Sequence, residues 1–218
     1  MDVLALKIDL HVHTCYSYDG LITPRQLITY SKKRGLDGVA VTDHDTIHGA
    51  LKLANRREIV VIPGVEVSSF QGHVLALNVT ELIPSKLSML ETVEKIHELG
   101  GVAVAAHPSV MIKGLRIRLS EGLGFDAVEV INSAAFPFFL STCLNRKMAV
   151  NLGLPQTGGS DAHYALEIGS AYTLIDADSE VDDIVEAIRK GKTTAFGKAI
   201  PWKIRLEKEV LSLKRRLQ

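Results

Sequence analysis

The chain has 218 residues, 46% of them hydrophobic and 23% charged, and its 25 basic and 25 acidic residues leave no net formal charge. This balance is ordinary for a soluble globular protein and excludes the overall basic field of a dedicated nucleic-acid binder, without excluding short or single nucleotides. Two cysteines are too few for a secreted disulfide framework. No apolar run approaches the roughly 20 residues that span a bilayer, and the acidic start of the chain fits no signal peptide. We therefore expect one cytoplasmic domain with no membrane partner.

The first half of the chain alternates between predicted strands and helices. A strand over residues 7–14 leads to a helix that begins at Thr23-Pro24, where threonine caps and proline suits the first helical position, and that ends near Gly35. The elements that follow are a strand over 37–42, a helix over 46–55, a strand over 58–62, an antiparallel pair over 65–70 and 73–79, and a helix from Ser85 or Ser88 to about Leu99.

The second half repeats this rhythm. Its predicted elements are a strand over 102–106, a loop with a short helix over 109–123, a strand over 127–131, a helix over 139–152, a strand over 156–159, a strand near 171–175, a helix over 180–190 and a strand near 193–196. Strands that alternate with helices indicate either an α/β barrel or a doubly wound sheet.

Polar residues at the strand ends favour the barrel. Six predicted strands end in side chains that can bind a cation or a polar ligand: His11 with His13, His44, Glu66, His107, Asn132, and Asp161 with His163. The carboxyl ends of all strands meet around one mouth in a parallel barrel, whereas a doubly wound sheet brings together only the strands beside its switch point. At 218 residues the barrel would be shorter than the ~250 residues of a typical eight-unit barrel, so a reduced or distorted version is expected.

The first strand carries two histidines one residue apart. Alternate side chains of a strand point to the same side, so His11 and His13 should converge, and Asp19 can fold back toward them from the next loop. Imidazole and carboxylate are ligands that zinc, manganese and iron accept. Taken alone, the pair could equally be two ordinary polar residues at the end of a strand.

The motifs together resemble one family. They read H-x-H-T-x-x-S-x-D-G from His11, T-D-H-D over 42–45, G-V-E over 64–66, a histidine at 73, A-H-P over 106–108 and G-S-D-A-H over 159–163. This set is similar to the polymerase and histidinol phosphatase (PHP) domain, from Ile8 to about Gly197. The resemblance implies a single-domain α/β fold, a distorted (β/α)7 TIM-like barrel over residues 1–200, with an amphipathic helix over 201–218 appended to it. It also implies a metal-dependent phosphoesterase, an enzyme that hydrolyses phosphoric ester bonds.

The resemblance also implies a ligand set for two or three divalent ions, which would be manganese, zinc or iron. The implied metal ligands are His11, His13, Asp19, His44, Glu66, His73, His107, Asp161 and His163. By analogy, one ion would be held by His11, His13, Glu66 and Asp161. A second would be held by Glu66, His73 and His107, and a third by Asp19, His44 and His163. Among these residues Glu66, Asp161 and His163 are the expected catalytic residues, with hydrolysis by a metal-bound hydroxide.

Other polar residues keep alternatives open. Asp43 or Asp45 is expected to orient the ring of His44, with direct ligation by Asp45 as an alternative. Asn132 would contact substrate or make a local turn hydrogen bond. Cys15 is expected to be structural. Two histidines fall outside the motifs: His97 is expected on a solvated surface, and His48 there or near the mouth.

Phosphate binding calls for positive charge beyond the metals. Lys113, Arg116 and Arg118 follow the A-H-P motif and could clamp a substrate phosphate, or they could form a solvated basic face.

The expected substrate is a small phosphomonoester or a nucleotide or oligonucleotide phosphoester, including short RNA or DNA. The T-D-H-D-T stretch and Asp19 resemble the nucleotide-acting group of the family, whose insertion after G-V-E is missing here. The alternatives are a catalytically silent metal-binding scaffold, or an amidohydrolase-type enzyme that cleaves C–N bonds. The amidohydrolase class typically uses a metal-bridging modified lysine, and no lysine here lies at a plausible strand end.

The stretch from Trp202 to Gln218 has apolar residues at helical spacing, namely Leu206, Val210, Leu213 and Leu217. This helix could pack against the barrel wall, form a homodimer contact, or bind RNA through the basic run over residues 214–216.

Overall fold

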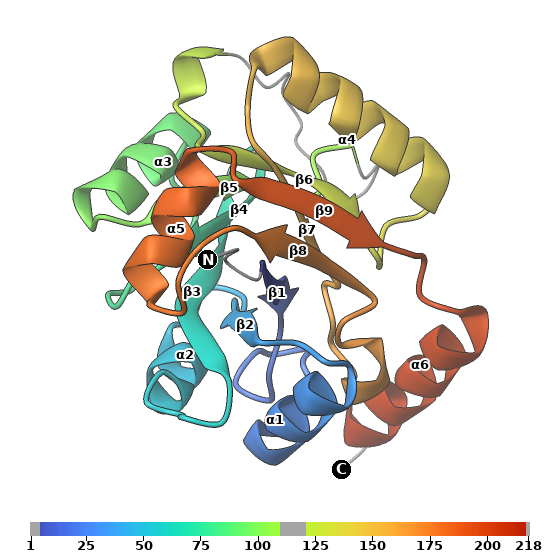
Figure 1. Cartoon of the computed structure of the whole chain (residues 1–218). Helices are drawn as coiled ribbons and strands as arrows, with labels where there is room; N and C mark the ends of the chain where they lie inside the picture. Colours follow the sequence, from blue (N-terminus) through green and yellow to red (C-terminus); the bar gives the residue numbers. More distant parts are fainter. Residues whose placement is uncertain (1–4, 110–120, 217–218) are drawn as a thin grey trace.

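A computed structural model describes residues 5–109 and 121–216, which form one twisted sheet surrounded by helices (Figure 1). The strands are β1 (Leu6–Val12), β2 (Gly38–Val41), β3 (Val60–Ser69), β4 (Gly72–Leu77), β5 (Val102–Ala105), β6 (Ala127–Asn132), β7 (Gln156–Gly159), β8 (Ala171–Ile175) and β9 (Thr193–Gly197). The helices are α1 (Pro24–Lys33), α2 (His48–Leu53), α3 (Met89–Glu98), α4 (Phe138–Leu152), α5 (Val181–Arg189) and α6 (Trp202–Arg216), with 3-10 turns at Glu121–Leu123 and Ala165–Glu167. None of the helices in this part of the chain has the length and hydropathy that crossing a bilayer requires.

The strand order is β7-β6-β5-β4-β3-β2-β1-β8-β9. Strands β1, β2 and β3 run parallel to one another, as do β5, β6 and β7, and β4 lies antiparallel between the two sets. Strands β8 and β9 continue the sheet beyond β1 as an antiparallel hairpin. The carboxyl ends of six parallel strands and the amino end of β4 therefore lie at one mouth.

The sheet nearly closes on itself between β7 and the β1–β8–β9 edge. Thr193 Oγ1 of β9 donates to the Gln156 carbonyl at 2.8 Å, and beyond the end of β7 the His13 amide donates to the Ala162 carbonyl at 2.8 Å. Gly159 makes this approach possible, because a Cβ there would lie 2.4 Å from the Cβ of His11. The expected α/β barrel is confirmed.

Local sequence signals account for several element boundaries. Thr23 and Ser88 each form a capping box, with Gln26 and Glu91 respectively, at the starts of α1 and α3. The two strands expected over 58–62 and 65–70 are in fact one strand, β3. Its first half pairs with β2 and its second half with β4, so the chain stays extended through Pro63-Gly64 while it changes partner.

An irregularity in β1 aims the two histidines of the first motif. The register between β1 and β2 shifts between Asp9 and Val12. Leu10 packs in the apolar cluster that contains Ala40, whereas Val12 packs in the cluster that lies against α1 and α2. The two-residue alternation is therefore interrupted, as in a β-bulge, and both His11 and His13 reach the mouth.

Helix α6 contacts the barrel through its polar side. Arg205 and Lys208 bond to barrel residues, whereas Trp202, Leu206 and Leu213 are 70%, 68% and 59% exposed. The helix therefore packs against the barrel, which is one of its three expected roles, although the apolar residues stay exposed in the part of the helix that the structure describes. Its polar face satisfies barrel carbonyls and a carboxylate instead.

Candidate metal centre

Four side chains converge at the centre of the mouth. The atoms that face one another are Nε2 of His11, Nε2 of His13, Oε2 of Glu66 and Oδ1 of Asp161. Five of the six distances between these atoms lie between 3.0 and 3.5 Å. Corners of a tetrahedron whose centre–ligand bonds are ~2.0–2.1 Å long are separated by roughly 3.3 Å. The group therefore has the ligand spacing of a tetrahedral cation site.

Glu66 connects this first group to a second one. Its Oε1 lies 2.8 Å from Nδ1 of His73 and 2.9 Å from Nε2 of His107, while its Oε2 faces the first group. Glu66 belongs to β3 and His73 to the antiparallel strand β4, so the β3–β4 hairpin brings these two side chains together. A carboxylate with one oxygen in each group is suited to bridge two cations.

A third group lies at the outer side of the mouth. Nε2 of His163 lies 3.1 Å from Oδ2 of Asp19, and Nε2 of His44 lies 3.6 Å from the same oxygen. His13 also reaches this group, so it lies between the first and third groups. The third group thus combines His13 and His44, which follow strands, with Asp19 and His163 from loops.

Buried ring nitrogens without hydrogen bonds indicate that these groups fit cations. Within the described residues, both ring nitrogens of His44 and Nδ1 of His73 are buried and have no hydrogen-bond partner. Leaving a buried polar atom unpaired costs about 1–3 kcal/mol. His73 and His44 both face carboxylate oxygens of Glu66, and a divalent ion between nitrogen and oxygen would satisfy both.

Opposite charges within the cluster shift its pKa values. Burial by itself raises the pKa of a carboxyl, but the neighbouring imidazoles hold the pKa of Glu66 and Asp161 well below the usual range. Burial disfavours a charged imidazole, yet the carboxylates raise the pKa of His11 above its usual value and that of His13 to about 9. For His44 burial dominates and lowers the pKa to about 3. The neighbouring carboxylates therefore favour the protonated form of both His11 and His13 when no cation is bound.

Glu129 is a member of the site that the motifs did not indicate. It is buried in β6, where its Oε1 accepts a hydrogen bond from Nδ1 of His11 at 2.9 Å and its Oε2 accepts from the amide of His107, also at 2.9 Å. A sequence signal was available, because Glu129 is the one charged residue in the apolar run over 127–131. A buried carboxylate requires partners of this kind.

Asn132 makes the local turn hydrogen bond that was one of its two expected roles. Its side-chain oxygen accepts from the Ala134 amide at 3.0 Å, which is the local turn bond. Its amide group donates to Glu129 at 3.0 Å and to Asp161 at 3.3 Å. Asn132 therefore lies beside the cluster, and substrate contact stays a prediction.

The expected role of Asp43 and Asp45 is wrong, because neither side chain bonds to the ring of His44. Asp43 accepts from the backbone amide and the hydroxyl of Thr14, and Asp45 accepts from the Ser68 amide at 2.8 Å. Both carboxylates fix loops that surround the ligands.

Three other residues lie outside the candidate cation groups. Cys15 is half-buried. His97 pairs with Asp126 on the surface, as expected. His48 is exposed and its ring contacts that of Tyr16.

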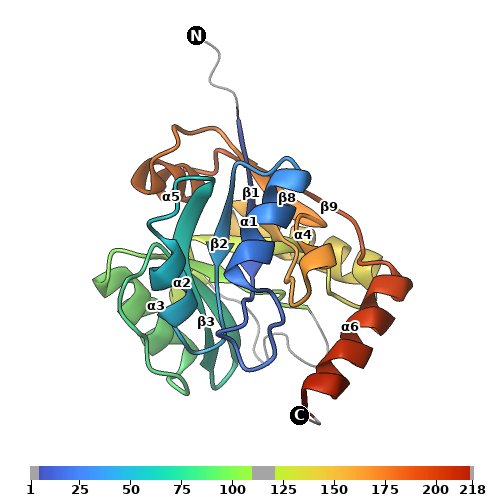
Figure 2. The ribbon, with the colours of Figure 1, turned by 90° about the horizontal axis from the view of Figure 1, so that it is seen from below.

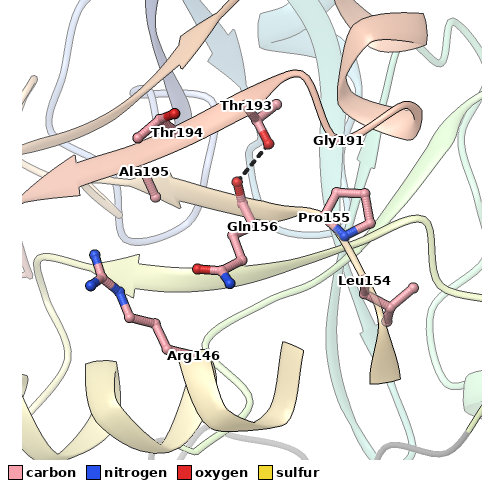
Figure 3. Close-up of a pocket in the computed structure, with 8 residues that line it drawn as sticks. All are labelled: Arg146, Leu154, Pro155, Gln156, Gly191, Thr193, Thr194 and Ala195. Atoms are coloured by element: carbon pink, nitrogen blue, oxygen red, sulfur yellow. Dashed lines mark hydrogen bonds between the residues drawn. The ribbon is translucent and has the colours of Figure 1, made fainter. Parts of the chain in front are cut away.

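The candidate phosphate-binding residues Lys113, Arg116 and Arg118 lie outside the described residues. A cavity of about 460 Å³ lies elsewhere, beside the amino end of β7, where Gln156, Thr193 and Arg146 line it (Figure 3). The candidate ligands lie beyond the carboxyl end of the same strand, so this cavity is separate from the candidate metal centre.

Comparison with known proteins gives two matching family models. The PHP domain model matches residues 9–154, and the model described as PHP-associated matches residues 144–193. The chain is 39% identical to an uncharacterised protein of Methanocaldococcus jannaschii over 142 residues, which cover 59% of this chain and 82% of that protein.

Two relatives with named activities match over shorter stretches. The chain is 35% identical over 99 residues to a phosphoribosyl 1,2-cyclic phosphate 1,2-diphosphodiesterase of Eggerthella lenta, covering 41% of this chain and 37% of that protein. It is 32% identical over 105 residues to a 5'-3' exoribonuclease of Haemophilus influenzae, covering 45% and 38%. The chain thus spans well under half of the length of either enzyme.

The fold is similar to that of a solved two-domain protein from Bacteroides vulgatus, described as containing a predicted PHP-like metal-dependent phosphoesterase. The TM-score is 0.72 at 18% sequence identity, and the match covers 89% of this chain and 65% of that one.

Proposed function

The chain belongs to the PHP domain family, a family of metal-dependent phosphoesterases, and from this premise we propose that it hydrolyses a phosphate ester at the nine-residue cluster. The observation that carries the proposal is the convergence of these imidazoles and carboxylates at one mouth, in overlapping groups whose ligand atoms lie within 4.8 Å of one another. Divalent cations bound there would lower the pKa of a water molecule and neutralise charge on the phosphoryl oxygens. We propose two or three such ions, of manganese, zinc or iron.

The protein side chains then have separable tasks. Glu66 would hold the first and second cation groups at a fixed spacing, because each of its oxygens faces one group. Asp161 and His163 lie on the loop after β7 and are slightly exposed, at 7% and 8%. Nδ1 of His163 donates to the Asp161 carbonyl at 3.0 Å, which leaves Nε2 to face Asp19 and the mouth. We propose Glu66, Asp161 and His163 as the catalytic residues of this set.

A nucleotide or short oligonucleotide is the proposed substrate. Tyr18 is 76% exposed, and its ring stacks on that of His44 with centroids 5.2 Å apart. An aromatic ring beside a phosphate-binding centre is suited to stack on a base. The two relatives with named activities act, by their names, on a phosphoribosyl cyclic phosphate and on RNA. A small phosphomonoester is the second candidate, since the insertion expected of nucleotide-acting relatives is absent.

Activity with a defined substrate panel tests this function. Phosphomonoesters, nucleotide phosphodiesters, short RNA, short DNA and cyclic amides would be assayed with manganese, zinc or iron added to metal-free protein. We expect metal-dependent release from phosphate esters, and a loss of about 100-fold or more in His107→Ala and Asp161→Ala. His97→Ala is the matched control, because His97 is a surface histidine. Turnover of cyclic amides alone, or activity unchanged by both substitutions and by chelators, would exclude the proposal.

We also propose that the enzyme works in the cytoplasm as a homodimer formed through α6. The free thiols of Cys15 and Cys143 suit a reducing compartment. The apolar residues of α6 form an exposed stripe of Trp202, Leu206, Val210 and Leu213. Spacings of four, four and three residues keep these side chains on one side of the helix.

Charge favours a second copy as the occupant of this stripe. Glu207 and Lys214 lie on the same flank of the stripe and are placed symmetrically about Val210 and Leu211. In an antiparallel pair related by a two-fold axis, Glu207 of each chain would face Lys214 of the partner subunit. The stripe is therefore complementary to itself.

A further inference from the structure

Three basic side chains of α6 each bond to a loop at the mouth of the barrel. Arg205, Lys208 and Arg215 bond to groups of the barrel, whereas the apolar stripe of the same helix is exposed. Figure 2 shows α6 beside the barrel, on the side where the chain passes from β1 to α1. Two of the three loops carry a residue of the cluster, and the third follows Asn132, which bonds to Asp161.

Lys208 bonds to the loop that carries His163. Its Nζ lies 3.1 Å from Oε1 of Glu167, a carboxylate that is fully buried. That oxygen has no hydrogen-bond partner among the described residues, so the ion pair with Lys208 is the contact that compensates its charge. The other carboxylate oxygen accepts hydrogen bonds from the backbone amides of His163 at 2.9 Å and Tyr164 at 3.0 Å. The ammonium of Lys208 therefore neutralises the carboxylate that fixes the backbone of His163.

Arg215 bonds to the loop that carries Asp19. Its guanidinium donates to the carbonyl of Gly20, the residue that follows Asp19. The same loop is joined to the first one, because the Leu21 amide donates to the His163 carbonyl at 2.8 Å. The Asp19 and His163 loops thus form one bonded unit with α6 on its outer side.

Arg205 bonds to the loop after β6. It donates to the carbonyls of Ser133 and Ala134, both at 3.0 Å. These residues follow Asn132, whose amide donates to Asp161. All three basic residues of α6 thus reach backbone or a carboxylate within a few residues of the cluster.

We propose that α6 is a positioning element for the third cation group, and that Lys208 and Arg215 are its main positioning residues. The inference rests on the proposed function, since it assumes that this group binds a cation. His13 and His44 lie beside strands, whereas Asp19 and His163 depend on loops that α6 holds. Loss of the α6 contacts should therefore lower the cation affinity of the third group selectively. The first two groups are built on strands β1 and β3 and on the ends of β5 and β7, so their cation affinity should stay near its original value.

Titration of metal-free full-length protein with Mn²⁺ by calorimetry tests the inference. The variants are Lys208→Met, which removes the charge and keeps the stem, and Arg215→Gln. Lys208→Arg tests rescue by a conservative change, and Lys203→Met is the matched control, because Lys203 is an exposed lysine on the same helix. We expect the weakest of three Mn²⁺ sites to lose about tenfold or more in affinity in Lys208→Met and Arg215→Gln. The other two sites should stay within about twofold, and both Lys208→Arg and Lys203→Met should match the unchanged protein.

Each other outcome overturns the inference. Three unchanged affinities in folded Lys208→Met and Arg215→Gln would show that α6 does not position the group, while wild-type ester hydrolysis would leave the proposed function standing. An equal loss at all three sites together with a lower Tm would assign α6 a general structural role. A wild-type protein that binds only two ions would remove the third group itself. If Lys208→Met fails to fold, Arg215→Gln alone decides, because Arg215 bonds to a backbone carbonyl rather than to a buried charge.

Discussion

Glu129 determines which nitrogen of His11 faces the cluster. A carboxylate accepts the Nδ1 proton of this ring, so Nε2, which points at Glu66 and Asp161, is the nitrogen that would offer its lone pair to a cation. The second oxygen of Glu129 accepts from the amide of His107, whose φ of 30° lies in the left-handed region that non-glycine residues rarely occupy. One buried carboxylate therefore fixes two ligands from different strands.

Glu129→Gln is expected to lower the affinity for the first cation while the fold is retained. The amide oxygen can still accept one hydrogen bond, but the charge that increases the basicity of His11 is lost, and such changes typically weaken binding by 10–100-fold. Titration with Zn²⁺ against a competing chelator measures the effect. Glu98→Gln is the control, since Glu98 is an exposed carboxylate. Equal affinities in the two variants would contradict this role.

The protons held by the metal-free cluster make its stability depend on pH. The pKa of His13 is raised from 6.5 to about 9, because hydrogen bonds to Asp161 and Glu66 outweigh the effect of burial. A raised pKa in the folded state stabilises the fold fully below pH 6.5, and this contribution is lost as pH rises toward 9. Metal-free protein should therefore lose stability between pH 6.5 and 9.

Thermal unfolding of the metal-free protein across this range measures the loss. A contribution of about 1 kcal/mol corresponds to about 2–4 °C in Tm for a chain of this size. Protein loaded with Mn²⁺ is the comparison, because a cation replaces the protons and the decline should be smaller. A Tm of the metal-free protein that is constant or rises from pH 6.5 to 9 would contradict the expectation.

At the level of single residues, the sequence predicted which side chains meet but not how they are held. All nine expected ligands come together because short motifs follow predictable strands. The partners of Asp43 and Asp45 were not predictable, since they depend on the Thr14 and Ser68 amides, which are distant in sequence. The left-handed backbone of Asp161, with φ of 54°, likewise has no local signal.

At the level of elements, periodicity identified strands and helices better than it identified their partners. The bounds of β8 match the expectation, and the Thr23 and Ser88 caps begin α1 and α3 as predicted. The change of partner within β3 was missed, because Pro63-Gly64 has the local chemistry of a turn while neighbouring strands keep it extended.

Helix α6 shows the same limit more clearly. An amphipathic pattern indicates that a helix has two faces, and it is usually the apolar face that packs. Here the polar face is used, because the loops at the mouth offer carbonyls and a buried carboxylate to Arg205 and Lys208. Only the tertiary arrangement of those loops decides which face contacts the barrel. The apolar face stays exposed and is available to a second chain.

At the level of the whole molecule, α6 connects the candidate metal centre with the proposed dimer contact, because each involves one face of this helix. The polar face bonds to the loops of Asp19 and His163, and the apolar stripe is exposed on the opposite side. A second chain bound to the stripe would restrain the helix against its own barrel. Dimer formation should therefore favour the arrangement in which the third group is complete.

The dimer is tested with charge reversal and light scattering after gel filtration. We expect twice the chain mass for the unchanged protein, and monomer for Leu213→Lys, because the lysine would place a charge in the apolar stripe. Glu207→Lys alone should weaken association by about tenfold, since it faces the partner's Lys214, and Lys214→Glu added to it should restore association. Restoration is specific to the antiparallel pairing, as a parallel pair would place like residues side by side. A monomeric unchanged protein at all concentrations, or a double variant as weak as the single one, would exclude this arrangement.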